Sequence, residues 1–75
     1  MKKVVLTGNN LTPKNVREEI IRRATKETQG AYAIVKKSST VKVLLFLDNN
    51  QILFKENESI KTFVCEEFLS VEFLA

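Results

Sequence analysis

The stretch TVKVLLFLDNNQILFK, residues 40–55, decides the fold because its pattern is that of two strands joined by a tight turn. Asn49 and Asn50 tolerate the positive φ angles that a two-residue hairpin turn requires. A turn centred on them predicts an antiparallel hairpin in the middle of the sheet. The facing pairs are then Leu47 with Ile52, Phe46 with Leu53 and Leu45 with Phe54.

The first strand of this hairpin is apolar on both faces, although a sheet covered on one side only should alternate apolar and polar residues. Leu44, Phe46 and Leu53 point to one face. Two explanations stay open: one helix covers each face, or both helices share a face and these three residues bind a partner or a second copy of the chain. The residues expected under the helices are Val41, Val43, Leu45, Leu47, Ile52 and Phe54.

Upstream of the hairpin, the pattern predicts a strand and then a helix. Residues 3–7 form the strand, and Gly8-Asn9-Asn10 breaks it because Gly and Asn tolerate positive φ. Thr12 is placed to cap the helix, with Pro13 as its first residue. The loop lacks the spacing of a phosphate-binding motif, so we interpret it as a turn followed by a cap.

The first helix is expected to run to about residue 29. Apolar residues recur every four positions and predict a buried stripe. Gly30 is expected just past the helix end, where a left-handed conformation is common. The residues of the stripe are Val16, Ile20 and Ala24, widened by Ile21.

Downstream, residues 31–37 predict a strand, and residues 58 to about 70 predict a second helix capped by Asn57. Residues 71–75 either continue that helix or form a short edge strand. The prediction is therefore a single two-layer α+β domain over residues 1–75, with the order β-α-β-β-β-α, a mostly antiparallel four-stranded sheet and two helices. The apolar face of the second helix would hold Ile60, Phe63, Val64, Phe68 and Val71.

Composition argues against catalysis. The 75 residues include no His and one Cys, so the commonest general base and metal ligand are missing. Cys65 has no second cysteine for a disulfide and no His to activate it. No apolar run reaches the roughly 18 residues that cross a bilayer. We expect a cytoplasmic, non-catalytic chain with no cofactor, no metal and no membrane partner.

Positive charge gathers in the first part of the chain. Residues 1–42 carry ten Lys or Arg against three Glu, whereas residues 43–75 carry two Lys against six acids. This polarity either gives a basic face for an anionic partner or lets the two parts attract each other within the fold. The candidate anion-binding residues are Arg17, Arg22, Arg23, Lys26, Lys36, Lys37 and Lys42.

Residues 4–16, with Val-Val-Leu-Thr-Gly-Asn-Asn-Leu-Thr at 4–12 and then Val16, resemble the N-terminal segment of aromatic amino-acid ammonia-lyases, especially histidine ammonia-lyase. The resemblance implies a strand, a Gly-Asn turn and a Leu-Thr helix cap. Those enzymes make their electrophile from an Ala-Ser-Gly that this chain lacks. Tyr32-Ala33-Ile34 resembles their active-site tyrosine segment, but Val35-Lys36-Lys37 replaces the Asn-Thr-Gly that follows. No catalytic residue is carried over.

The sequence thus favours a protein that acts by binding. The first hypothesis is a non-catalytic protein-interaction or regulatory module, with a homodimer as one form, that uses Leu44, Phe46 and Leu53. An alternative is nucleic-acid or anion binding through the basic first helix and the strand lysines. A third is a fragment or relative of an ammonia-lyase without its active site.

Overall fold

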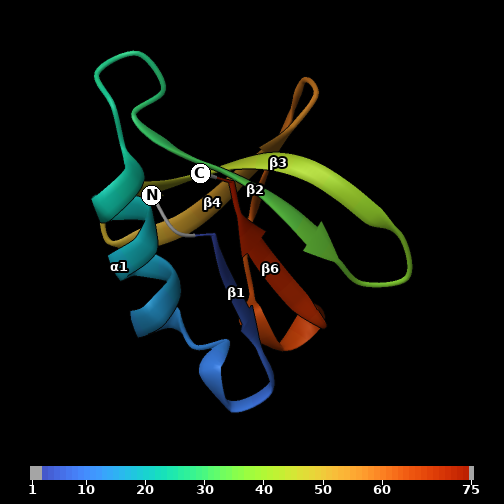
Figure 1. The fold of residues 1–75 in the computed structure, drawn as a ribbon. Helices are drawn as coiled ribbons and strands as arrows, with labels where there is room; N and C mark the ends of the chain where they lie inside the picture. The colour runs from blue at the N-terminus through green and yellow to red at the C-terminus, as the bar shows by residue number, and fades with distance from the viewer. Residues whose placement is uncertain (1–2, 75) are drawn as a thin grey trace.

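The computed structural model describes residues 3–74, which form one six-stranded antiparallel sheet and, within that range, a single α-helix (Figure 1). The helix α1 spans Pro13–Arg23 and follows the first strand. The strands are β1 (Val4–Thr7), β2 (Gly30–Lys36), β3 (Thr40–Asp48), β4 (Gln51–Glu56), β5 (Ser59–Thr62) and β6 (Ser70–Phe73). Their order across the sheet is β1-β6-β2-β3-β4-β5.

The predicted entry into α1 is confirmed. Gly8 has φ 58° and opens a 3₁₀ turn, which the Leu11 amide closes by donating to the Gly8 carbonyl at 3.2 Å. The hydroxyl oxygen of Thr12 accepts a hydrogen bond from the Asn15 amide at 3.2 Å, as an N-cap does. The turn and the cap therefore set the direction in which α1 leaves β1.

The predicted end of α1 is wrong, because the helix stops at Arg23 and not near residue 29. The hydroxyl of Thr25 accepts from the Thr28 amide at 3.1 Å, which offers the backbone an alternative to another helical turn. Gln29 then takes a positive φ of 56°, and Gly30 begins β2 instead of ending the helix.

The central hairpin has the predicted turn and register. Asn49 and Asn50 have φ 50° and 67°. The side chains of Val43, Leu45, Ile52 and Phe54 are buried, and Val41 and Leu47 pack against that core. The pairs Leu45 with Phe54, Phe46 with Leu53 and Leu47 with Ile52 face each other as expected.

The predicted second helix is absent, which corrects the fold class: residues 3–74 contain six strands and one helix, not four strands and two helices. Asn57 takes φ 55° in a turn that leads into β5. The amide of Phe63 bonds to the Ile52 carbonyl at 2.8 Å and continues the pairing beyond β5. A 3₁₀ turn, Cys65–Glu67, then connects to β6.

Strand β6 settles the question left open for residues 71–75. It lies inside the sheet, between β1 and β2, and not at an edge. Val71 and Phe73 are fully buried there, because they face the core between two hydrogen-bonded neighbours. Ala75 lies outside the described residues.

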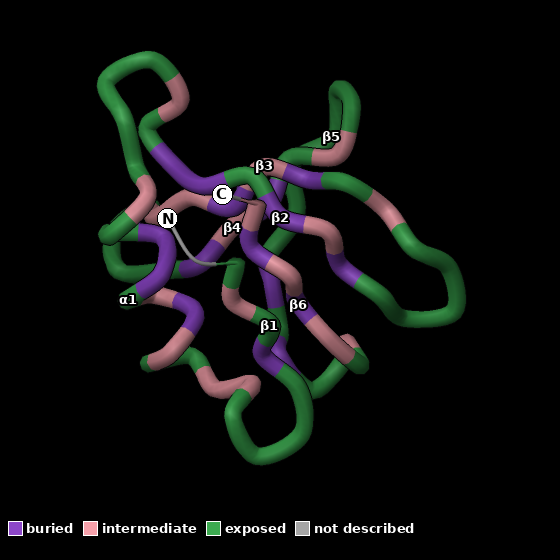
Figure 2. Tube along the Cα trace, in the orientation of Figure 1, coloured by how far each residue is buried: buried purple, intermediate pink, exposed green. Residues whose placement is uncertain are grey.

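The core lies between α1 and one face of the sheet, where α1 contacts β2 and β3 (Figure 2). Val16 and Ile20 face this core from the helix, as predicted. Ile21 was expected to widen the stripe but is 63% exposed, and Ala24 is exposed at the helix end. One short helix therefore covers only one side of the sheet.

Candidate functional site

The sheet face opposite α1, the outer face, carries the three predicted interface residues. Leu44 lies between Tyr32 on β2 and Lys55 on β4, and Phe46 pairs with Leu53 on β4. Because directly paired residues point to the same face, all of these side chains share one side of the sheet. Leu44, Phe46 and Leu53 are each half-buried, although α1 lies on the other side.

More apolar side chains extend this surface than the sequence predicted. Ile60 on β5 faces Lys55 and is 59% exposed, and Tyr32 is 47% exposed. Ile60 was missed because it was assigned to the second helix. Tyr32 was missed because the sequence provided no register for β2 against β3, although the two strands were expected to be neighbours. The outer patch, as we name this surface, comprises Tyr32, Ile34, Leu44, Phe46, Leu53 and Ile60.

Charged residues of both signs border the outer patch. The Lys42 ammonium lies 5.4 Å from the centre of the Tyr32 ring, a cation–π contact. Lys55 is next to Leu44 in the register, and Asp48 stands at the turn end of β3. Glu72 on β6 forms an ion pair with Lys3, with 2.7 Å between Nζ and Oε1. A partner therefore meets an apolar centre with a mixed charged border.

The seven predicted anion-binding residues do not gather at one place. Arg17 uses Nη2 to donate to the Asn50 carbonyl at 3.1 Å, which ties α1 to the β3–β4 turn. Lys26 lies in the loop after α1, whereas Lys36 and Lys37 lie at the far end of β2. The structure brings only Arg22, Arg23 and Lys42 together, around one cavity.

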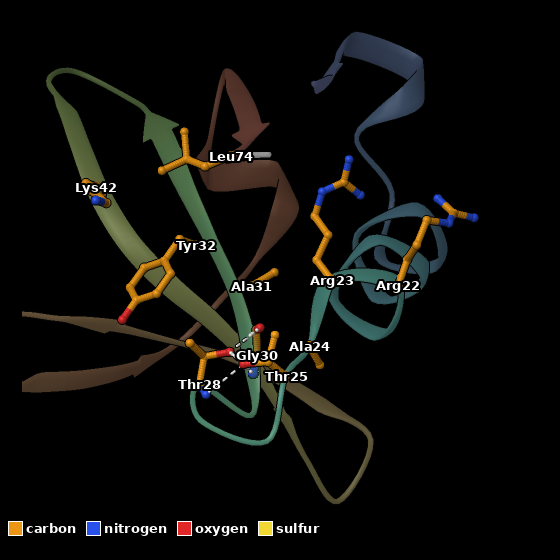
Figure 3. Close-up of a pocket in the computed structure, with 10 residues that line it drawn as sticks. All are labelled: Arg22, Arg23, Ala24, Thr25, Thr28, Gly30, Ala31, Tyr32, Lys42 and Leu74. Carbon is orange, nitrogen blue, oxygen red and sulfur yellow. Dashed lines mark hydrogen bonds between the residues drawn. The ribbon is translucent and has the colours of Figure 1, made fainter. Parts of the chain in front are cut away.

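This cationic cavity has a volume of about 520 Å³ and lies between the C-terminal end of α1 and the start of β2 (Figure 3). Arg22 and Arg23 stand on one side, and Tyr32 and Lys42 stand on the opposite side (Figure 3). The Thr28 hydroxyl donates to the Gly30 carbonyl at 2.9 Å and shapes the floor. The remaining lining residues are Ala24, Thr25, Ala31 and Leu74.

A buried carboxylate holds the two arginines. Glu19 accepts from Nη1 of Arg22 through Oε1 and from Nη1 of Arg23 through Oε2. The Arg23 side chain is 6% exposed, and its guanidinium lies 5.6 Å from the centre of the Phe73 ring. Arg22 lines the cavity and its side chain remains 58% exposed, so its other N–H groups are open to solvent.

Residues 3–74 contain no group of three or more His, Cys, Asp or Glu side chains placed to hold a metal ion. No helix in that range is both long and apolar enough to cross a membrane. Cys65 is buried, and burial raises the pKa of its thiol, with the nearby charge of Glu66 raising it further.

Comparisons with protein families, curated proteins and solved structures found no match to this chain. The resemblance of residues 4–16 to ammonia-lyases therefore stays a prediction. The outer patch and the cationic cavity are the two surfaces on which a functional argument rests.

Proposed function

We propose that this chain is a non-catalytic protein-interaction module whose outer patch binds a second copy of the chain. The observation that carries the proposal is the single helix: it covers one sheet face, while Leu44, Phe46 and Leu53 are apolar on the other. Large contiguous apolar patches on soluble domains mark sites where another molecule binds. A small domain gains the burial that it lacks by pairing such faces.

The dimensions of the face suit a dimer. Strands about 4.8 Å apart make a six-stranded sheet about 24 Å wide. The whole molecule measures 30 × 28 × 21 Å, so a standard interface, in which each partner buries roughly 800 Å², would occupy most of one broad side. A stable dimer would therefore use the charged border as well as the outer patch.

The charges on the border also suit self-association. Lys42 and Lys55 lie on the same face as Asp48. A two-fold axis makes each residue of one copy meet a different residue of the other, so unlike charges can be set beside each other. We place this interaction in the cytoplasm, since the single cysteine gives no internal disulfide.

Molar mass measured by analytical ultracentrifugation over a concentration series tests the proposal. The wild-type chain should be a dimer. Ile60→Lys should raise the dissociation constant of the dimer by roughly tenfold or more, because a charge then enters the apolar contact. Ile60 is exposed in the single chain, so this variant should keep its fold. Phe46→Lys should act in the same direction.

Ile21→Lys is the matched control, because Ile21 is equally exposed but lies on α1, away from the outer patch. It should leave the dimer unchanged. A wild-type chain that stays monomeric at every concentration contradicts the proposal. So does an Ile60→Lys variant that dimerises as well as the wild type.

A further inference from the structure

We infer that the cationic cavity binds a small phosphate monoester that carries a planar or apolar organic group. This inference adds a ligand site beside the dimer contact: the cavity shares Tyr32 with the outer patch and Lys42 with its charged border, while none of Leu44, Phe46 and Leu53 lines it. At about 520 Å³, the cavity has the size of small-molecule sites, which range over roughly 300–1,000 Å³.

The lining selects for an anion. Arg22, Arg23 and Lys42 contribute three positive charges, and no Asp or Glu lines the cavity among the described residues. Glu19 offsets one charge by binding both arginines. The C-terminal end of α1 contributes about half a negative charge more, which leaves a surplus of about +1.5. A phosphate monoester carries about −1.5 to −2 at neutral pH and matches this surplus.

The arginines are held ready for such a ligand. Glu19 fixes both guanidinium groups on one side of the cavity before any ligand arrives. Arg22 uses Nη1 for Glu19, and a guanidinium has five N–H donors, so further donors can bind phosphate oxygens in the fork geometry that arginine prefers. Lys42 lies on the opposite side of the cavity, beside Tyr32, as a point charge (Figure 3).

The rest of the lining suits an organic group. Tyr32 presents an aromatic ring, and Ala24, Ala31 and Leu74 present apolar surface. The Thr25 hydroxyl is already bonded to Thr28, whose amide donates to it at 3.1 Å and whose hydroxyl lies 2.9 Å away. A ligand with a phosphate at the arginine side and a flat body toward Tyr32 therefore satisfies both halves of the cavity.

Titration calorimetry with AMP, adenosine and inorganic phosphate tests the inference on the wild-type chain. AMP should bind, and adenosine and inorganic phosphate should each bind at least tenfold more weakly, because each lacks half of the ligand. The same titration followed by amide chemical shifts should perturb residues 28–32 and leave residues 51–56 unchanged.

Charge-removing variants locate the site. Arg22→Gln should weaken AMP binding by about tenfold, since a charge-assisted hydrogen bond to the phosphate is lost, and Lys42→Gln should weaken it by a smaller factor, since Lys42 lies on the Tyr32 side of the cavity. Both side chains are exposed, so the fold should persist. Lys61→Gln is the matched control on β5, removes the same charge and should have no effect.

Three results would overturn the inference. The first is no heat or shift change with AMP. The second is an equal loss of affinity in Lys61→Gln, which would show attraction by net charge alone. The third is adenosine or inorganic phosphate binding as tightly as AMP.

Discussion

Gly30 on β2 lies directly opposite Phe46 on β3, and the two backbones approach so closely that position 30 has no room for a side chain. A β carbon there would lie 2.3 Å from the carbonyl oxygen of Leu45 and 3.0 Å from the β carbon of Phe46. The nearer obstacle is backbone, which cannot rotate away. This glycine is therefore required by a close approach within the sheet.

Gly30→Ala should lower the free energy of unfolding by about 1–3 kcal/mol, the usual cost of forcing extra atoms into a packed site. Urea denaturation followed by circular dichroism measures this. Gly8 offers the contrast: its added β carbon would meet nothing within 4 Å, but its φ is 58°. Gly8→Asn should be tolerated, because Asn adopts positive φ readily. Equal losses in the two variants would contradict the steric reason given for Gly30.

Glu19 and its two arginines predict an asymmetric response to mutation. Glu19→Gln should cost about 3 kcal/mol, because the buried Arg23 charge loses its carboxylate. Arg22→Gln should cost less than about 1 kcal/mol, since its side chain is 58% exposed and solvent screens the ion pair. Thermal and urea unfolding measure both. A small loss in Glu19→Gln would show that the cluster contributes little to the attachment of α1.

Three phenylalanine rings pack together, two in the segment around residues 58–70, which was predicted to be a second helix, and one on β4. The rings of Phe63 and Phe68 stack with their centres 4.6 Å apart, and both meet Phe54 edge-on at 6.2 and 5.9 Å. A double-mutant cycle with Phe63→Leu and Phe68→Leu should give a coupling energy of about 0.5–1.5 kcal/mol, as aromatic pairs do.

Phe46→Leu is the control for this cycle, because Phe46 lies on the outer face and the three rings belong to the covered core. Its effect should add to that of Phe63→Leu within about 0.5 kcal/mol. In a helix, residues 63 and 68 would point about 140° apart and could not stack. If the effects of Phe63→Leu and Phe68→Leu were additive, the result would favour a helix in this segment over the observed extended chain.

Local chemistry explains which parts of the fold were predictable. The β3–β4 hairpin depends on Asn49 and Asn50, whose tolerance of positive φ is a property of the residues themselves. The Thr12 cap is local in the same sense. The stretch after Asn57 has apolar residues at helical spacing, yet tertiary contacts of Phe63 with Ile52 and Phe54 favour extended chain there.

The candidate sites, like the fold, were predictable only where a local sequence pattern was sufficient. The two-sided apolar pattern was enough to predict Leu44, Phe46 and Leu53 on one face. The cationic cavity was not predictable, because it requires the end of α1 to lie beside Tyr32 and Lys42. Residues 23 and 42 come together only through the β2–β3 pairing. The residues of the loop after α1, which line the bottom of the cavity, were expected to be helical.

Cys65 predicts a pH dependence of thiol reactivity. Burial raises the pKa of its thiol above the ordinary value of 9.0, and the Glu66 charge raises it further, while a backbone hydrogen bond acts in the opposite direction. Only the thiolate reacts with iodoacetamide, so alkylation of the folded chain near pH 8 should be much slower than in urea and should accelerate above pH 9. Equal rates in the folded and unfolded chain would contradict this.

Variants of two neighbouring glutamates distinguish the effect of charge on the Cys65 pKa from the effect of burial. Glu66→Gln removes the charge that raises the pKa of Cys65, so alkylation at a fixed pH should become faster. Glu67→Gln removes the same charge one residue further on and should change the rate less.

The stability of the folded chain should also depend on pH through Cys65. Since the folded chain favours the protonated thiol, this contribution to stability is complete below pH 9.0 and is lost as the pH rises through the folded-state pKa. Unfolding measured from pH 8 upward should therefore show a shallower decline in Cys65→Ala than in the wild type.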